Sequence, residues 1–301
     1  MARGYVPALL LLAALWGASF LFIELALRDL EPTVVIGLRM WISTLVLLPL
    51  LLAREGRRAL GQLRARWRAL VFLGVLNSAV PFTLIAWGQQ HVDSGVAAIA
   101  NASAPIFVVL LAIRFLPSER VTGVRFAGIL LGLAGIAVLS GVDPAGGWWA
   151  VAGTLAVVLA GVSYAIGSLF VQTRLGGGEG LLLAAGSMAV GAITLTPLAA
   201  AQAPSEVPGW GALAAVAALG VAGTAVGLLL YFHLIGRYGA TRASLVVYLL
   251  PPAALLYGAL FLDEPLRAPA AAGLVLILAG VALGSGVVSS RGRPIAVEVR
   301  S

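Results

Sequence analysis

Apolar residues run along this chain in long stretches, separated by short segments that carry arginine, proline and glycine. A helix needs about 20 apolar residues to cross about 30 Å of hydrocarbon, and the stretches have that length. The pattern predicts an all-α polytopic membrane protein of about ten transmembrane helices. The expected spans are Pro7–Leu27, Pro32–Ala53, Ala69–Gly88, Ser94–Ile113, Thr122–Gly141, Trp149–Thr173, Leu181–Ala201, Trp210–Phe232, Gly239–Phe261 and Pro269–Val288.

The spans divide into two similar sets. The segment Gly128–Gly141 (GILLGLAGIAVLSG) reappears about 145 residues later as Gly273–Gly286 (GLVLILAGVALGSG). We therefore expect a first repeat at 1–146 and a second at 147–301, each with five helices. Because five is an odd number, the second repeat enters the membrane upside down relative to the first. Inverted repeats are typical of alternating-access carriers, whose ligand sites lie near the midplane between the halves.

Small residues and prolines inside the spans have structural interpretations. The glycines of the repeated segment fall at three- and four-residue spacing, which predicts close packing of two helices. Pro105, Pro251 and Pro252 are expected to bend their helices, and they could either free carbonyl groups toward a cavity or shape the scaffold alone.

Composition supports a membrane protein and excludes several classes of site. Of the 301 residues, 61% are hydrophobic and 10% are charged. The mean hydropathy is +1.04, and soluble domains carry about 25% charged residues. Cysteine is absent, which excludes disulfides and thiolate-ligated metals, and the presence of only two histidines argues against a histidine-rich site. We expect no metal and no cofactor.

Every basic residue other than histidine is arginine, which gives the net charge of +7, and most of the arginines occupy loops and tails. If the N-terminus is cytoplasmic, the inner segments hold most of them and the outer loops hold only Arg28 and Arg267. This bias predicts an integral plasma (inner) membrane protein with both termini in the cytoplasm. It explains the charge without nucleic acid, so the expected partners are the lipid bilayer and a small-molecule substrate, bound by a monomer.

Several short motifs resemble a known family. They are Trp16-Gly-Ala-Ser-Phe in the first span, Pro105 in the fourth, Glu119-Arg120 before the fifth, and the glycine-rich fifth and tenth spans. The chain resembles the EamA-type carriers of the drug/metabolite transporter superfamily, most closely the YddG-type aromatic amino acid exporters. The resemblance implies the ten-helix fold and transporter activity, and leaves the substrate open. In the second repeat Tyr164 stands in place of Trp16.

Polar residues at depth are the first candidates for a substrate site. Asn77 and Ser78 lie near the middle of the third span, Thr224 occupies the position of Ser78 in the second repeat, and Asn101 lies inside the fourth span. Polar groups that faced lipid would be unsatisfied, so these side chains are expected to face the bundle. They could bond helix to helix or line the pathway.

Aromatic rings are the second group of candidates. Trp16, Trp87, Tyr164 and Tyr248 are candidates to bind substrate, and Trp16 and Tyr248 lie deeper than an interfacial aromatic belt requires. Buried packing is the alternative interpretation for each ring.

Charged residues inside spans are the third group, because a charge in the hydrocarbon is costly. Arg39 lies about 10 Å from the outer end of the second span, and Glu24 lies near the outer end of the first. Arg39 could extend outward to water, pair with Glu24 or bind a substrate carboxylate, and we expect the pair.

These features predict a secondary carrier that exports aromatic or apolar amino acids, or similar amphipathic metabolites, through a central cavity between the repeats. A drug or organic-cation exporter and a carrier of anionic phosphorylated metabolites are the alternatives. The motifs of hydrolases, metalloproteases and nucleotide-binding loops are absent, so an enzyme is not expected.

Overall fold

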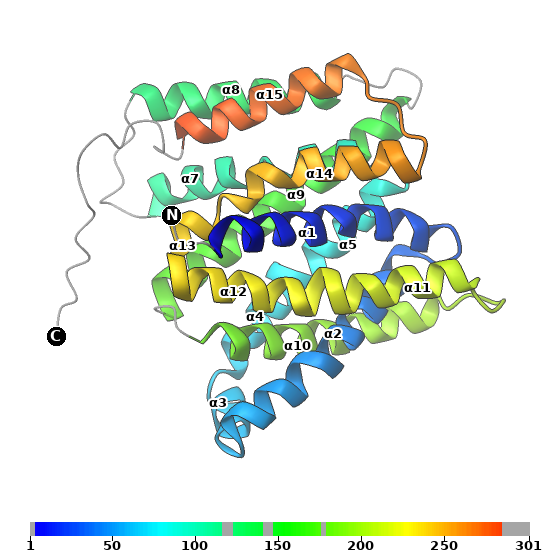
Figure 1. The fold of residues 1–301 in the computed structure, drawn as a ribbon, viewed down its shortest axis with the longest axis vertical. Helices are drawn as coiled ribbons and strands as arrows, with labels where there is room; N and C mark the ends of the chain where they lie inside the picture. The colour runs from blue at the N-terminus through cyan, green and yellow to red at the C-terminus, as the bar shows by residue number, and fades with distance from the viewer. Residues whose placement is uncertain (1–3, 116–122, 141–146, 176–178, 285–301) are drawn as a thin grey trace.

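The structure is a computed structural model that describes residues 4–115, 123–140, 147–175 and 179–284. Its long helices lie side by side (Figure 1). The first repeat contains α1 (Tyr5–Leu27), α2 (Pro32–Glu55), α3 (Arg58–Ala65), α4 (Trp67–Gly74), η1 (Val75–Ala79), α5 (Val80–Gln89), α6 (Ser94–Asn101), α7 (Ala104–Phe115) and α8 (Gly123–Ser140). The second repeat contains α9 (Gly147–Phe170), η2 (Val171–Leu175), α10 (Gly180–Ala201), α11 (Trp210–Ala218), η3 (Leu219–Val226), α12 (Gly227–Tyr238), α13 (Ala240–Ala243), α14 (Val246–Phe261) and α15 (Ala268–Gly284).

Ten apolar helical segments confirm the expected membrane-spanning fold. Within the described ranges, seven segments are long and apolar enough to cross a membrane. Three shorter apolar helices, at Phe126–Leu139, Val246–Phe261 and Ala268–Leu283, complete the ten. The predicted ends of the fifth span, at Thr122 and Gly141, and the end of the tenth span after Gly284 lie outside the described residues.

Helix contacts recur between the halves as an inverted pair requires. Helix α1 packs on α14, and its counterpart α9 packs on α6 and α7. Helix α2 packs on η3, and its counterpart α10 packs on α4 and η1. Two pairs join counterparts directly: α2 lies against α10, and α8 lies against α15 at the opposite side of the bundle (Figure 1). The pseudo-two-fold axis between the halves therefore passes through both pairs.

Glycines bring α8 and α15 into backbone contact, as their spacing predicts. A Cβ atom on Gly280 would lie 2.5 Å from the backbone nitrogen of Gly132. A Cβ on Gly135 would lie 2.8 Å from the backbone nitrogen of Ile277. Such an approach leaves no room for a side chain, and it gives the dense packing that holds helices together in lipid.

Two π-helical segments occur at equivalent places in the repeats, and the sequence pattern did not predict them. Segment η1 interrupts the third span at Val75–Ala79, and η3 interrupts the eighth at Leu219–Val226. Ser78 lies in η1 and its counterpart Thr224 lies in η3. Wide helical turns of this kind are rare and frequently mark functional sites. Because they occupy equivalent positions, η1 and η3 are candidates for a functional site formed at the same level of both repeats.

The fourth and ninth spans are broken. Helix α6 ends at Asn101 and α7 begins at Ala104, so Pro105 lies in the first turn of a new helix, where its missing N–H costs nothing. In the ninth span the break lies between α13 and α14, and Pro251 and Pro252 lie inside α14. The short helix α3, in the arginine-rich loop between the second and third spans, was also not expected.

Candidate substrate site

The segments η1 and η3 lie at the centre of their spans. Ser78 is eleven residues from either end of the span Trp67–Gln89, and Thr224 is fourteen residues from either end of Trp210–Tyr238. Both hydroxyl side chains are buried. The Thr224 hydroxyl donates to the carbonyl of Leu219 at 2.9 Å, which satisfies an acceptor in the widened turn. Both side chains therefore lie midway along their apolar helices.

Arg39 reaches this level from α2. Its Nε donates to Thr224 Oγ1 at 2.8 Å, and its Cζ lies 3.8 Å from the centroid of the Phe82 ring. Tyr164 from α9 lies within electrostatic range of the guanidinium, and its ring centroid is 6.4 Å from that of Phe82. Helices α2, α5 and α9 and segment η3 thus converge on one guanidinium, a cluster that we call the Arg39 site (Arg39, Phe82, Tyr164 and Thr224).

The backbone around Arg39 follows the internal symmetry, but the side chain does not. A Cβ on Gly220 would lie 3.1 Å from the carbonyl oxygen of Arg39, and a Cβ on Gly74 would lie 2.8 Å from that of Ser187. Gly220 and Gly74 are counterparts, so Ser187 is the counterpart of Arg39. The Ser43 hydroxyl also joins α2 to η3, at 2.7 Å from the Arg39 carbonyl and 2.9 Å from that of Gly220. The first repeat therefore contributes a charge to this shared framework, where the second contributes a neutral hydroxyl.

The expected pair between Arg39 and Glu24 is not formed in this structure. Arg39 is directed toward Thr224, whereas Glu24 accepts a hydrogen bond from Gln89 Nε2 at 3.3 Å. The same Gln89 nitrogen donates to the carbonyl of Phe20 at 2.9 Å, which ties α1 to the outer end of α5. Glu24 therefore belongs to the outer part of the bundle, and Arg39 belongs to its centre.

Arg39 is 7% exposed, and in the part of the chain that the structure describes its side chain has one hydrogen bond and no ion pair. The charge of an arginine at the centre of a membrane helix costs about 2.5 to 3.5 kcal/mol on insertion scales. The Phe82 ring offsets part of this cost by a cation–π contact of about 0.5 to 2 kcal/mol. The guanidinium is thus held in place while most of its five N–H donors have no protein acceptor.

Trp16 and Tyr164 occupy equivalent positions in the two repeats, and each contacts a ring of the other repeat: Trp16 contacts Tyr231 of α12, and Tyr164 contacts Phe82 of α5. The Trp16 ring centroid lies 5.2 Å from that of Tyr231, and its indole Nε1 lies 2.5 Å from where a Cβ on Gly227 would stand. Sequence reasoning missed Phe82 and Tyr231, because an aromatic residue in an apolar span gives no signal of its own. Only their contacts with Arg39 and Trp16 identify them.

Asn77 packs against the second repeat. Its Oδ1 would lie 2.3 Å from a Cβ on Gly167 of α9. The symmetry-related contact places Ser19 Oγ at 2.6 Å from a Cβ on Gly223 of η3. A polar side chain thus fills the space above a glycine in both halves, which makes Asn77 part of the joint between η1 and α9.

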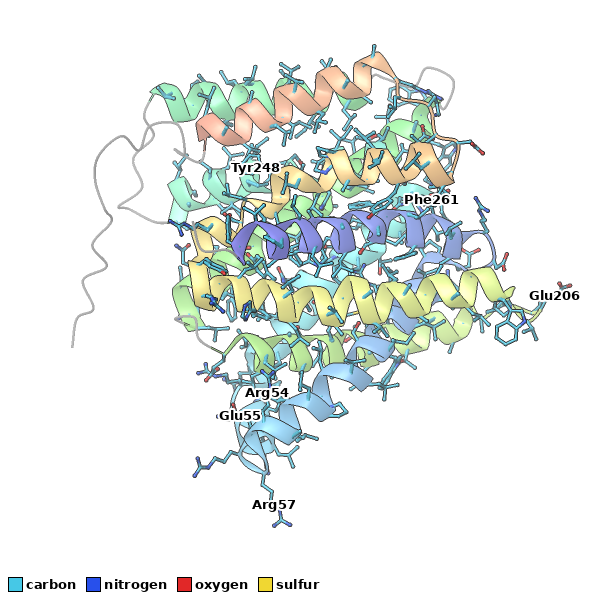
Figure 2. The ribbon with its side chains drawn as sticks, viewed as in Figure 1. Arg54, Glu55, Arg57, Glu206, Tyr248 and Phe261 are labelled. Atoms are coloured by element: carbon cyan, nitrogen blue, oxygen red, sulfur yellow. The ribbon has the colours of Figure 1, made fainter. Side chains whose placement is uncertain are left out.

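Like Trp16, Asn77 and Ser78, three further predicted residues are not part of the Arg39 site. Trp87 lies near the C-terminal end of α5, with its ring edge-to-face at 4.6 Å from His91, whose own ring stacks on Trp149 at 5.2 Å. Asn101 ends α6, and its buried Oδ1 has no hydrogen-bond partner among the described residues. Tyr248 packs against the apolar core near the start of α14 (Figure 2).

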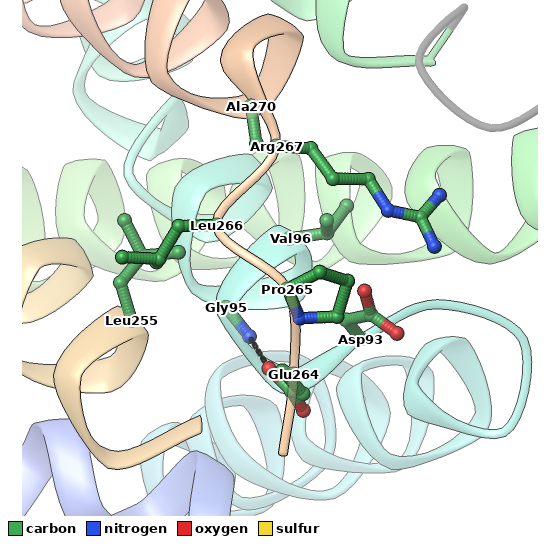
Figure 3. A pocket seen from close by; sticks show the side chains of 9 residues that line it. All are labelled: Asp93, Gly95, Val96, Leu255, Glu264, Pro265, Leu266, Arg267 and Ala270. Carbon is green, nitrogen blue, oxygen red and sulfur yellow. Dashed lines mark hydrogen bonds between the residues drawn. The ribbon is translucent and has the colours of Figure 1, made fainter. Parts of the chain in front are cut away.

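A small pocket between the start of α6 and the loop after α14 contains none of the predicted residues. Asp93, Gly95, Val96, Leu255, Glu264, Pro265, Leu266, Arg267 and Ala270 line it (Figure 3). The Glu264 carboxylate accepts the backbone N–H groups of Ser94 and Gly95, at 2.7 and 3.1 Å. Glu264 thereby satisfies two backbone donors at the start of α6 and acts as the N-terminal cap of that helix.

Ten membrane-spanning helices in two inverted repeats, with a polar cluster between them at mid-membrane, define a polytopic protein with the architecture of a secondary transporter. The chain belongs to the EamA-like transporter family, whose family model matches residues 4–141 and 151–286.

Relatives cover nearly the full chain. An uncharacterized transporter of Archaeoglobus fulgidus is 29% identical over 276 residues, covering 91% of this chain and 95% of its own length. A probable terminal-alkyne amino-acid exporter of Streptantibioticus cattleyicolor is 32% identical over 286 residues, covering 92% of each. The uncharacterized inner membrane transporter YedA of Escherichia coli is 27% identical, covering 83% of this chain and 80% of its own.

A crystal structure with 22% sequence identity superposes with a TM-score of 0.66, and the match covers 95% of this chain and 98% of the other. At that identity the likeness concerns the fold alone.

Proposed function

We propose that this chain is a secondary carrier that exports aromatic or apolar amino acids, or similar amphipathic metabolites, by alternating access between its two repeats. The observation that carries this proposal is the 32% identity, over 92% of both chains, to a protein named as a probable amino-acid exporter. The Arg39 site supports it, because rings and a cation lie together between the repeats, where a molecule with an apolar side chain and a carboxylate could bind.

The equivalent helix contacts in the two inverted repeats allow the carrier to alternate between inward-open and outward-open states. Exchanging the packing of the two halves converts a state open to one side into a state open to the other. The α2–α10 and α8–α15 pairs lie on the axis, so they can stay in place while the remaining helices exchange contacts around them. We assign the substrate to the level of η1 and η3, at the centre of that exchange.

We further propose that the protein lies in the inner membrane with both termini in the cytoplasm. Figure 2 shows Arg54 and Arg57 at one end of the bundle and Glu206 at the other. By the positive-inside rule the arginine-rich end faces the cytoplasm. Transport from that end to the other is export.

The alternative substrates are less well supported by the charges at depth. Among the described residues, Arg39 is the one buried charged side chain. An unpaired cation repels organic cations, which disfavours a drug or organic-cation exporter. A phosphorylated metabolite carries more than a single negative charge and would require further cations at this level.

Transport into liposomes tests the proposal. The purified chain should accumulate labelled phenylalanine or leucine faster than protein-free liposomes do, and an excess of unlabelled substrate should compete. Labelled tetraphenylphosphonium and glucose 6-phosphate serve as the cationic and phosphorylated comparisons. Uptake of either comparison compound with none of the amino acids would refute the proposed substrate class.

A further inference from the structure

The guanidinium of Arg39 has no protein counter-charge in the described residues, although it is buried at the centre of the membrane-spanning bundle. We propose that Arg39 receives the carboxylate of the transported molecule, so that the carrier selects monocarboxylates with an apolar body. The inference rests on the proposed function, since it names the group by which that function's substrate is held.

The depth of the guanidinium fits a substrate site. Its Nε lies 2.8 Å from Thr224 Oγ1, and Thr224 is the central residue of a 29-residue span. Inverted-repeat carriers bind their ligands near this level, because a site there can be reached from both sides in turn. An arginine that served only to anchor a helix would extend out of the bundle, and Arg54 and Arg57 are exposed in this way.

The bonding pattern leaves one edge of the guanidinium free. Thr224 occupies the Nε side, and the Phe82 ring covers one face at 3.8 Å from Cζ. The two Nη groups have no acceptor among the described residues. A carboxylate binds such a pair of N–H groups through both of its oxygens in a planar fork, which explains an arginine here better than a lysine.

The surroundings decide what else the substrate carries. The Phe82 ring of α5 covers the guanidinium, and the Tyr164 ring of α9 lies beside Phe82, with the two ring centroids 6.4 Å apart. Rings accept an aromatic or aliphatic body beside the carboxylate. A second carboxylate would find no second buried cation in the described part of the chain. The predicted class is therefore a single carboxylate on an apolar body.

A competition assay tests the role of Arg39. Uptake of labelled phenylalanine into liposomes is measured against unlabelled phenylalanine, phenylalaninamide and phenethylamine. For the wild type, the acid should compete about tenfold to a hundredfold better than the amide, since a charge-assisted contact distinguishes them. Arg39→Gln should reduce this preference to less than about twofold, as no charge remains to distinguish acid from amide.

Two further variants keep the test informative. Arg54→Gln makes the same substitution at an exposed position of the same helix, and it should keep the wild-type preference. Arg39→Lys keeps the charge without the planar fork, so it should prefer the acid with weaker competition. A wild-type carrier that accepts acid and amide equally overturns the inference, as does a folded Arg39→Gln variant that keeps the full preference.

A binding measurement separates this inference from the proposed function. The melting temperature of the purified protein is recorded with 3-phenylpropionate, which has the carboxylate and no amino group, and with 3-phenylpropionamide. Stabilisation by the acid that is lost in Arg39→Gln supports the Arg39 role even if no amino acid is transported. Amino-acid transport with an unchanged acid preference in Arg39→Gln refutes the role and leaves the proposed function in place.

Discussion

The Glu264 carboxylate lies at the start of α6, where its Oε1 accepts the backbone N–H of Ser94 at 2.7 Å from 170 residues further along the chain. Figure 3 shows the neighbouring bond, from the backbone N–H of Gly95 to the same carboxylate. This contact joins the loop after α14 to the first repeat at the outer end of the molecule. Gly258 makes room for it, because a Cβ there would lie 2.3 Å from Glu264 Oε2.

Removing this cap should destabilise the protein. Glu264→Ala leaves the first donors of α6 without an acceptor and should reduce the free energy of unfolding by about 1 to 2 kcal/mol, whereas Glu264→Gln, which keeps one acceptor, should cost less. Thermal melting in detergent measures both. Glu206→Ala changes an exposed glutamate in another outer loop and should leave the melting temperature unchanged; equal losses at the two positions would exclude the cap.

A side chain at the α8–α15 contact should separate the two helices. Gly280→Ala places a methyl group 2.5 Å from a backbone nitrogen of α8, which cannot move aside without shifting the helix. We expect a loss of about 1 to 3 kcal/mol in stability. Gly211→Ala in α11 is the matched control, because nothing lies within 4 Å of the added Cβ. A neutral Gly280→Ala variant would contradict the packing described.

The joint between η1 and α9 can be tested by a double-mutant cycle. Gly167→Ala should lower the melting temperature, since its methyl group would collide with Asn77 Oδ1. In an Asn77→Ala background the space opens, so the same change should cost less, with a coupling of about 0.5 to 3 kcal/mol. Strictly additive effects would show that the two residues do not touch in solution.

Trp16 should matter for transport more than for folding. Its ring contacts Tyr231 and the glycine at Gly227, one helical turn from Thr224. Trp16→Ala should reduce amino-acid uptake about fivefold to thirtyfold, since a lost ring contact with substrate costs on the order of 1 to 2 kcal/mol. Trp149→Ala removes a ring that is 66% exposed and should transport normally. Parallel loss of folded protein and uptake in Trp16→Ala would assign this ring to packing.

Cysteine labelling tests the orientation, in a chain with no native cysteine. Ser205→Cys, between α10 and α11, should react with an impermeant maleimide added to intact cells. Gly61→Cys, on α3, should react only after the membrane is opened, because the arginine-rich end faces inward. Labelling of Gly61→Cys in intact cells would reverse the topology.

The spans, the two repeats and the mid-span positions of Ser78 and Thr224 could be predicted, because they follow from the length of the apolar stretches and from the similarity between the two halves of the sequence. The π-segments could not be predicted, since a wide turn differs from an α-helical one in hydrogen bonding and not in composition. The hydrogen-bond partner of Arg39 could not be predicted from the sequence either. Its distance along α2 suggested the outer surface, whereas its side chain extends from there to Thr224, and Gln89 binds Glu24 instead.

The pairing of α2 with α10 and of α8 with α15 has an evolutionary consequence. Contacts between counterparts on a two-fold axis are those of a self-complementary dimer, so a half-length ancestor could have assembled in the same way from two identical chains. In such a dimer every residue appears twice, and an arginine at position 39 would occur once against each of the two symmetry-related glycines. Fusion into one chain frees the copies to diverge. Arg39 in the first repeat and Ser187 at the equivalent position of the second are such a divergence, and they give the fused chain a single guanidinium where two identical chains would have two.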